Sequence, residues 1–137
     1  MSDATDQPTY LYKLVPSTSP VPNQSAIPDA LPLSELDAKS GFIHLSTAHQ
    51  VGGTLKHFFA QDTHVWVLKI AFAKVADKIR WESPDAKVCG PRPEEGLFPH
   101  LYNGPRLGKA EVDDVARWEK GEGWDEALEK AKSWLVY

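Results

Sequence analysis

The chain has 137 residues, 42% of them apolar, and a formal net charge of −4 at pH 7. This length corresponds to one ordinary domain, and its apolar share is sufficient for a hydrophobic core. The negative charge argues against extended nucleic acid as a partner. A single cysteine, Cys89, excludes an intrachain disulfide, and no apolar run is long enough to cross a membrane. We therefore expect a cytoplasmic domain that does not span a membrane.

The N-terminal part of the chain predicts a strand, a long proline-rich segment and a short helix. Residues 1–8 are polar and predict a disordered tail, which leaves residues 9–137 as the domain. Residues 9–15 are rich in aromatic and branched side chains and predict a strand. Five prolines exclude a helix or an inner strand over residues 16–32, so we expect this segment to cover a pocket. Residues 33–41 begin near a capping serine and end with glycine, which predicts a helix.

The middle of the chain predicts a strand, a helix and a second, central strand. Residues 41–46 alternate in polarity, which is typical of a strand. Ser46 or Thr47 is expected to cap the helix that follows. The apolar stripe of that helix consists of Val51, Leu55, Phe58 and Phe59. Residues 64–72 have apolar side chains on both faces, which predicts a strand that is covered on both sides.

The C-terminal part of the chain mixes short strands with irregular segments and ends in a helix. Residues 78–82 predict a strand, whereas prolines and glycines predict that residues 83–108 are mostly irregular. Residues 110–121 fit a strand or a helix, and residues 124–135 predict a helix. Short strands interrupted by helices, without even alternation, predict a single α+β domain.

Two histidines lie in segments that predict a fixed orientation. His44 and Ser46 share one face of their strand, and a buried polar pair must be hydrogen-bonded or face a cavity. The alternative is a core histidine satisfied by backbone, with Ser46 as a helix cap. His100 lies between apolar anchors in the segment 97–103, which favours a directed side chain. The alternative is an aromatic-anchored turn in which the histidine has no role.

Apart from the two histidines, the sequence offers few candidate functional residues. Glu82 ends a short strand and faces either solvent or a cleft. No HExxH or paired CxxC pattern occurs, so we expect no metal site, and neither a GxSxG elbow nor a glycine-rich phosphate loop is present. Basic side chains outnumber acidic ones over residues 69–109, which favours a small anionic ligand there.

The segments GFIHLS (41–46) and FPHLY (98–102), together with the Trp81–Glu82 pair, resemble the family called domain of unknown function 952. The resemblance covers roughly residues 9–116. That family is grouped with the ADP-ribosyltransferase-like superfamily. The resemblance therefore implies a split, strongly curved β core with flanking helices, and a cleft between its halves that accommodates NAD or ADP-ribose.

The resemblance also implies roles for individual residues. It makes Glu82 the carboxylate that stabilises an oxocarbenium-like state at the ribose, as in glycoside hydrolysis, and makes His44 and His100 donors that orient the ligand. Ser46 would contact ribose or phosphate. Many relatives have a histidine at the position of Lys13. The cofactor-binding set is expected to consist of Ser46, Lys13, Tyr102, Arg92 and Arg106.

The function implied is binding of NAD or a related small nucleotide, with cleavage or transfer at the anomeric carbon by an ADP-ribosyl transferase or NAD glycohydrolase. Two alternatives stay open. One is a nucleotide-binding module without catalysis, which Lys13 favours. The other is RNA 2′-phosphate processing, because RNA 2′-phosphotransferases of the same superfamily carry a similar histidine-containing strand before a serine. The sequence does not decide whether the chain is an enzyme, nor its oligomeric state.

Overall fold

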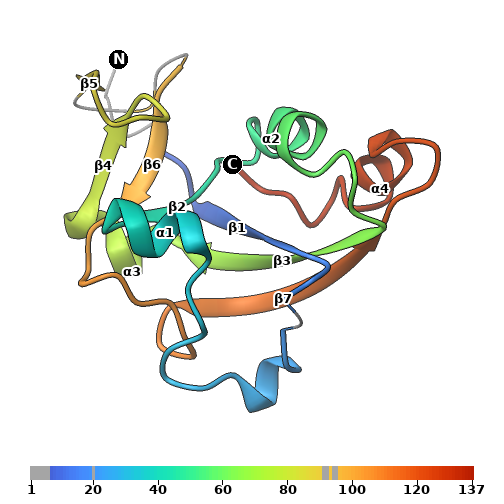
Figure 1. Cartoon of the computed structure of the whole chain (residues 1–137), viewed down its shortest axis with the longest axis horizontal. Helices are drawn as coiled ribbons and strands as arrows, with labels where there is room; N and C mark the ends of the chain where they lie inside the picture. Colours follow the sequence, from blue (N-terminus) through green and yellow to red (C-terminus); the bar gives the residue numbers. More distant parts are fainter. Residues whose placement is uncertain (1–6, 20, 91–92, 94–95) are drawn as a thin grey trace.

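Two antiparallel sheets form the framework of the chain (Figure 1). The computed structural model describes residues 7–19, 21–90, 93 and 96–137. The three-stranded sheet has the order β1 (Tyr10–Pro16), β3 (His64–Ala71), β7 (Val112–Glu119). The four-stranded sheet has the order β2 (Ile43–His44), β6 (Phe98–Leu101), β4 (Ile79–Glu82), β5 (Cys89–Gly90). The prediction of an α+β class is confirmed.

Four short helices and two 3-10 turns complete the described chain. The helices are α1 (Glu35–Ser40), α2 (Val51–Phe58), α3 (Phe72–Val75) and α4 (Asp125–Lys130). The 3-10 turns are η2 (Gln24–Ala26) and η3 (Ala76–Lys78). Among the described residues, no helix has the length and apolar character that crossing a membrane requires.

The three-stranded sheet is covered on both faces, as the apolar pattern of residues 64–72 predicts. Leu68 and Ile70 of β3 belong to a core cluster that includes Ile43, Leu45, Trp81 and Leu101 from the region of the four-stranded sheet. Val65 and Val67 belong to a second cluster, on the other face, with residues of α2 and α4. Figure 1 shows these two helices next to each other on one side of the sheet. The four-stranded sheet therefore forms one layer, and α2 with α4 the opposite layer.

The helix predicted over residues 33–41 is confirmed as α1. The Ser34 hydroxyl accepts a hydrogen bond from the Asp37 amide (3.0 Å), and Gly41 closes the helix with φ of 82°. A left-handed residue at this position is adopted by glycine without the steric cost that other residues carry.

The cap predicted for α2 is wrong. The N-cap residue is Gln50, whose side-chain oxygen accepts from the Thr47 amide at 3.0 Å, so neither Ser46 nor Thr47 caps the helix with its side chain. Val51 and Leu55 are buried as predicted. Phe58, however, is 76% exposed because it lies on the solvent side of the helix.

The segment 83–108, predicted to be mostly irregular, contains β5 and the inner strand β6. The prolines of this segment, including Pro99 of β6, favour irregular structure because proline cannot donate a hydrogen bond to a neighbouring strand. The ambiguous residues 110–121 form β7, whose pairing with β3 decides between strand and helix. The helix predicted over residues 124–135 is present but shorter, as α4.

The position of Pro99 also determines how the two sheets are joined. The Leu45 amide donates to the Pro99 carbonyl (3.0 Å), but proline has no N–H to donate in return. Pairing between β2 and β6 therefore ends at His44. Ser46 pairs instead with Tyr12 of β1 through two hydrogen bonds of 2.8 Å, which links the four-stranded sheet to the three-stranded one.

The proline-rich segment 16–32 is held by backbone hydrogen bonds to the loop before β7. The Leu31 amide donates to the Leu107 carbonyl (2.8 Å), and the Lys109 amide to the Pro28 carbonyl (2.9 Å). As predicted, the segment covers a cavity, described below. Residues 1–6 of the predicted tail lie outside the described residues, and the chain is already buried at Pro8.

Candidate functional site

One face of the four-stranded sheet carries the polar residues of the candidate site. In the β2–β6 register His44 lies opposite His100, and in the β6–β4 register His100 lies opposite Arg80. Directly opposite residues of antiparallel strands project on the same face, so these three side chains form one row across the sheet. Their sequence neighbours Ile43 and Leu101 project on the other face, into the core.

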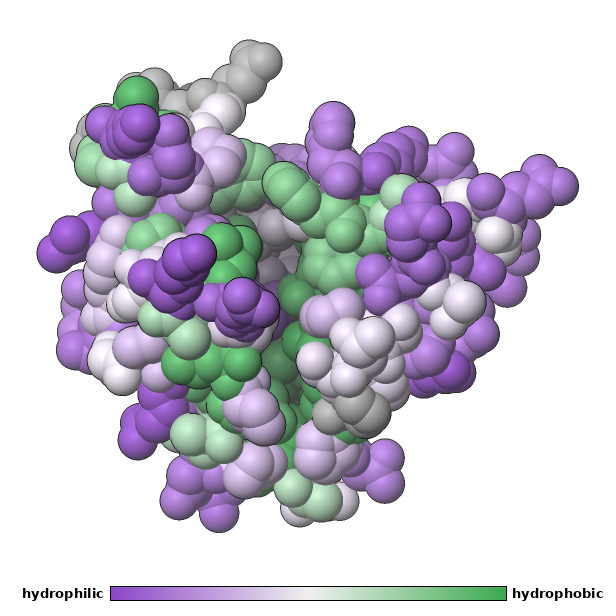
Figure 2. All heavy atoms as spheres, viewed as in Figure 1, coloured by the Kyte–Doolittle hydropathy of each residue, from purple (hydrophilic) through white to green (hydrophobic). Residues whose placement is uncertain are grey.

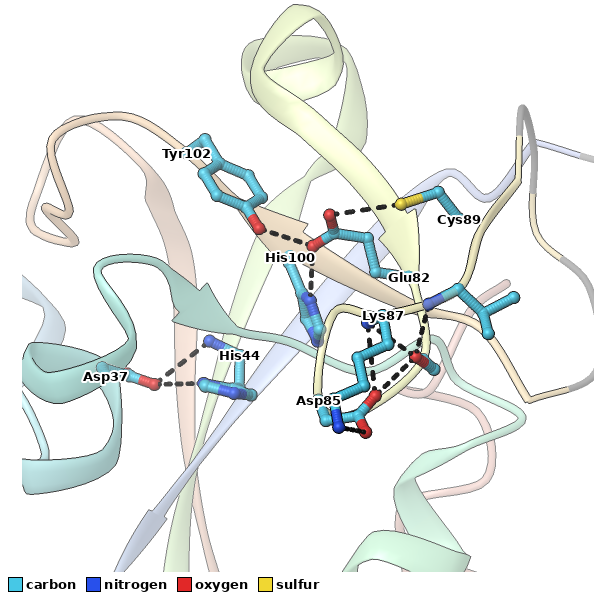
Figure 3. A network of polar contacts seen from close by, with 10 residues as sticks. Asp37, His44, Glu82, Asp85, Lys87, Cys89, His100 and Tyr102 are labelled. Atoms are coloured by element: carbon cyan, nitrogen blue, oxygen red, sulfur yellow. Dashed lines mark hydrogen bonds and ion pairs between the residues drawn. The ribbon is translucent and has the colours of Figure 1, made fainter.

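His100 is oriented by a buried carboxylate. Its Nδ1 lies 2.9 Å from Oε1 of Glu82, and both side chains are nearly inaccessible to solvent. The same Glu82 oxygen accepts from the Tyr102 hydroxyl at 2.6 Å, and the Cys89 thiol lies 3.6 Å from Oε2. Figure 3 shows Tyr102, His100 and Cys89 converging on this one carboxylate.

These contacts assign the protonation states around Glu82. Burial by itself raises the pKa of Glu82, but hydrogen bonds from Tyr102 and His100 outweigh it and leave the pKa below its ordinary value. Burial lowers the pKa of His100, an effect that Glu82 only partly offsets. Burial and the bond to Glu82 raise the pKa of Tyr102 to about 12. At neutral pH the site therefore holds an ionised Glu82, a neutral His100 and a protonated Tyr102.

His44 is oriented by a second carboxylate from a different element. Its Nδ1 lies 2.7 Å from Oδ1 of Asp37 in α1, and its backbone amide donates to the same oxygen at 3.2 Å. The Lys13 ammonium binds Oδ2 of Asp37 at 2.5 Å and the His44 carbonyl at 3.2 Å. Asp37 is only 2% exposed, so Lys13 supplies the charge that its burial requires.

The ion pair and the histidine fix the charge of Asp37. Burial raises the pKa of Asp37, but the His44 hydrogen bond and the charge of Lys13 outweigh it, and the net shift is downward. Burial lowers the pKa of Lys13, and Asp37 partly restores it. Asp37 is therefore a carboxylate, which requires that His44 donate its Nδ1 proton to it.

The two imidazoles meet over an aromatic ring. Their centroids lie 4.9 Å apart at an interplanar angle of 61°. The Phe42 ring contacts both imidazoles, with centroid distances of 4.6 Å to His44 and 4.4 Å to His100, and it stacks on the His100 ring. The prediction that Phe42 and His44 share a face is borne out by this contact. The two histidines, 56 positions apart in the sequence, are thus neighbours in the fold.

Each ring has one nitrogen left for a ligand. Both Nδ1 atoms face carboxylates, and no hydrogen bond within the described part of the chain involves either Nε2. The His44 side chain is 22% exposed, whereas that of His100 is 1% exposed, so Nε2 of His44 is the more accessible of the two. In the neutral form each Nε2 carries a lone pair and accepts a hydrogen bond. For His100, whose pKa is lowered by burial, the sequence-based expectation of a donor therefore becomes one of an acceptor.

Of the other residues predicted to bind a cofactor, some lie at the histidine pair and others do not. Tyr102 belongs to the site because its hydroxyl donates a hydrogen bond to Glu82, and Lys13 belongs to it because its ammonium group binds Asp37. Ser46 is buried, and its hydroxyl contacts Thr54 Oγ1 (3.3 Å), so the structure gives it a place in the link between the sheets. Arg106 is directed to Glu111, at 3.5 Å, and has no contact with the histidines. Arg92 lies outside the described residues.

Two members of the site, Asp37 and Arg80, are not among the site residues that the sequence predicts. Asp37 lies within the predicted helix 33–41, and its contact with His44 depends on how α1 packs against β2. The signal for Arg80 is the alternation along residues 79–82, which places it on the same face as Glu82. Its guanidinium lies 4.3 Å from the centre of the Tyr102 ring.

A cavity of about 230 Å³ lies on the other side of Asp37. Lys13, Ser34 and Asp37 form its polar end, and its walls are mainly apolar residues from β1 and the proline-rich segment. Figure 2 shows this face of the molecule hollowed, with hydrophobic residues along the depression. A second cavity, of about 500 Å³, lies between β7 and α4 and includes none of the predicted site residues. No cluster of three metal-ligating side chains occurs in the described ranges.

Comparison with known proteins identifies a family. The model described as "Protein of unknown function (DUF952)" matches residues 20–123. The crystal structure of protein CC0527 from Caulobacter crescentus is 24% identical, covers 82% of this chain and 89% of that chain, and gives a TM-score of 0.62.

A double mutant of CC0527 gives the same values in its crystal structure. The solution NMR structure of CC0527 is 22% identical, covers 82% of this chain and 87% of that chain, and gives a TM-score of 0.56. None of the curated proteins matches the chain. The structural likeness shows a shared fold, and the family model extends over most of the sequence. The chain therefore belongs to the family of proteins of unknown function designated DUF952.

Proposed function

We propose that this chain is an ADP-ribosyltransferase-like domain that binds NAD or a related small nucleotide at His44 and His100. The observation that carries the proposal is the pair of adjacent imidazoles, each fixed through Nδ1 by a buried carboxylate and each presenting Nε2. Rings held in this way lose little further freedom when a ligand binds. The two-sheet framework, with helices on its flank, supports the superfamily assignment.

The ligand groups that suit these rings are hydroxyls. A neutral imidazole with its Nδ1 proton committed accepts at Nε2, and a ribose hydroxyl is a donor of the right kind. His44, with 22% of its side chain exposed, is the more accessible ring, and His100 lies behind it. In this proposal His44 makes the first contact with the sugar and His100 fixes its orientation.

The cavity next to Lys13 supports a ligand with a second, less polar part. Asp37 lines the polar end of this cavity and also binds His44. A ligand part in the cavity and a ligand part at the histidines would therefore lie on either side of the same carboxylate. Lys13 has two of its three N–H donors engaged, by Asp37 and by the His44 carbonyl. The third donor is available to an acceptor atom of a base or amide in the cavity.

The role of Glu82 differs from the sequence-based expectation. It is 3% exposed, and His100, Tyr102 and Cys89 surround its two oxygens. A carboxylate in this position does not contact a ribose directly, and it acts by holding His100 in one tautomer. We therefore assign Glu82 as a positioning residue rather than as the group that stabilises an oxocarbenium-like state.

The experiment that tests binding compares NAD and ADP-ribose in thermal-shift and calorimetric titrations. A ligand that binds only the native state raises the melting temperature by mass action. His44→Gln and His100→Gln replace the ring by an amide and are expected to weaken binding at least about tenfold. His64→Gln, on β3 and away from the row, is the matched control and should bind like the wild type. Unchanged affinity in both site variants would overturn the assignment.

A nucleotide-binding module without catalysis is the second candidate. The engagement of Glu82 favours it, because cleavage at the anomeric carbon calls for a group that stabilises the developing cation. Release of nicotinamide from NAD during prolonged incubation, abolished in His44→Gln, would support the transferase or glycohydrolase. Tight binding of NAD without any release would instead assign the chain to the binding module.

A further inference from the structure

We infer that Arg80 is the phosphate-recognising residue of this site and that its ligand is a phosphorylated nucleoside rather than a free nucleoside. This inference rests on the proposed nucleotide binding and adds to it the ligand's charged group and the residue that reads it. The first observation is position. Arg80 lies directly opposite His100 on the neighbouring strand, so it continues the row that begins with His44.

The second observation is the conformation of the Arg80 side chain. Its guanidinium lies 4.3 Å from the centre of the Tyr102 ring, in a cation–π contact. No hydrogen bond among the described residues uses the Arg80 guanidinium, so its N–H groups remain available as donors. Tyr102 is itself fixed by its hydroxyl bond to Glu82 (2.6 Å). The contact therefore holds the cation in place before any ligand arrives.

The third observation is the absence of a competing anion at contact distance. Of the arginines that the structure describes, Arg106 and Arg117 each pair with a glutamate, whereas Arg80 has no ion-pair partner within 4.0 Å. Glu82 lies two residues away on the same face, but its oxygens receive His100, Tyr102 and Cys89. Arg80 is thus the described arginine whose donors are open to an external oxyanion.

The chemistry of a phosphate matches this arrangement. A guanidinium presents N–H donors in a planar fork that suits two phosphate oxygens. The neighbouring Nε2 of His100 accepts from a hydroxyl. A ligand that satisfies both must carry a phosphate close to a free hydroxyl, which is the chemistry of a ribose phosphate. The charge of Arg80 also selects against the uncharged nucleoside.

The test measures affinity by calorimetry for AMP, adenosine, NAD and inorganic pyrophosphate in wild type, Arg80→Gln and Arg106→Gln. Charge-assisted hydrogen bonds to phosphate correspond to about a ten- to hundredfold change in affinity. We expect Arg80→Gln to weaken binding of AMP and NAD by this factor and to leave adenosine within twofold of wild type. Arg106→Gln, which removes another exposed arginine, is expected to leave all four affinities unchanged.

The outcomes separate this inference from the proposed function. Equal affinity of Arg80→Gln and wild type for AMP and NAD overturns the role of Arg80, as does an equal loss for adenosine. Loss in Arg106→Gln instead would assign the phosphate to the other arginine. If wild type binds pyrophosphate in an Arg80-dependent manner but neither AMP nor NAD, the nucleotide proposal fails and the phosphate site stands. If wild type binds none of the four compounds, both fail.

Discussion

The charge state of His100 determines how the protein responds to acid. Burial lowers the pKa of His100 below its ordinary value of 6.5, so the unfolded chain takes up this proton at a higher pH than the native protein does. Below about pH 6.5 the unfolded state therefore binds more protons, and the free energy of unfolding falls as the pH falls. Glu82, whose pKa is lowered from 4.5, adds a second loss below about pH 4.5.

We expect urea midpoints to decrease in two stages between pH 7.5 and pH 3.5. His100→Gln should lack the upper stage while keeping the lower one, whatever its own stability at neutral pH. The measurement is the midpoint of urea unfolding at closely spaced pH values for both proteins. A His100→Gln profile that runs parallel to wild type through pH 6.5 would contradict the assignment of this titration to His100.

At the Lys13–Asp37 pair, the two charges depend on each other for their burial. Lys13→Met removes the cation and leaves a carboxylate with 2% exposure, for which we expect a loss of about 3–5 kcal/mol in the free energy of unfolding. The double variant Lys13→Met/Asp37→Asn should recover part of this loss, because the uncompensated charge is gone. Chemical denaturation of the three proteins measures the coupling. A single variant as stable as wild type would show that the pair does not contribute.

At the scale of the elements, the proline-rich segment is packed tightly against the loop before β7. A Cβ placed on Gly108 would lie 1.9 Å from the Asp29 carbonyl oxygen and 2.6 Å from that of Pro28. Gly108→Ala therefore forces the two backbones apart and should break the hydrogen bond from the Lys109 amide to Pro28. We expect a clear fall in melting temperature and faster amide exchange at Lys109.

The control for Gly108 is a glycine with open space around it. Gly53 lies inside α2, and a Cβ there would meet nothing within 4 Å. Gly53→Ala should raise stability by about 0.5–1 kcal/mol, since alanine is the better helix former. Equal effects of the two substitutions in thermal unfolding would show that the close approach at Gly108 is relieved without cost.

The elements that the sequence predicts well are those whose pattern is local. Ser34 and Gly41 specify the ends of α1 by themselves, and the double-sided apolar pattern of residues 64–72 predicts the central β3. The errors arise from long-range pairing. β6 contains Pro99 and reads as a loop, yet strands on both sides pair with it. Residues 110–121 fit two periodicities, and only the β3 pairing decides between them.

For the whole molecule, the C-terminal segment is attached to the first strand. The Tyr12 hydroxyl accepts from the Val136 amide (2.7 Å) and donates to the Val136 carbonyl (3.0 Å). Lys69 donates to the Trp134 carbonyl (2.8 Å) and lies over the Tyr10 and Trp134 rings. The end of the chain therefore packs on β1, the strand that also bridges to Ser46.

Tyr12→Phe removes both contacts with Val136 and keeps the ring. We expect a loss of about 1–3 kcal/mol in the free energy of unfolding, because the Val136 groups lose their partner. Hydrogen exchange should accelerate at Val136 more than at Leu68, which lies in the central strand. Uniform acceleration at both positions would indicate global destabilisation rather than release of the C-terminal segment.

The candidate site shows which of its members can be predicted from the sequence and which depend on the folded structure. His44, His100, Glu82 and Tyr102 were expected to act together, and the structure brings them onto one sheet face. Their hydrogen-bond partners could not be derived from the sequence. Asp37 reaches His44 because α1 packs at the edge of β2, and Arg80 joins the row through the β4–β6 register. Both depend on tertiary geometry that no local pattern encodes.

The cross-strand alignment of His44, His100 and Arg80 has a consequence for how such a chain can change its length. Because side chains alternate between faces, a one-residue insertion or deletion within β4 or β6 would send Arg80 or His100 into the hydrophobic core. The same event would bring a leucine or tryptophan to the outer face. Natural variation in length is therefore expected in the connecting segments, whereas the short strands should tolerate exchange of residues but not a change in their number.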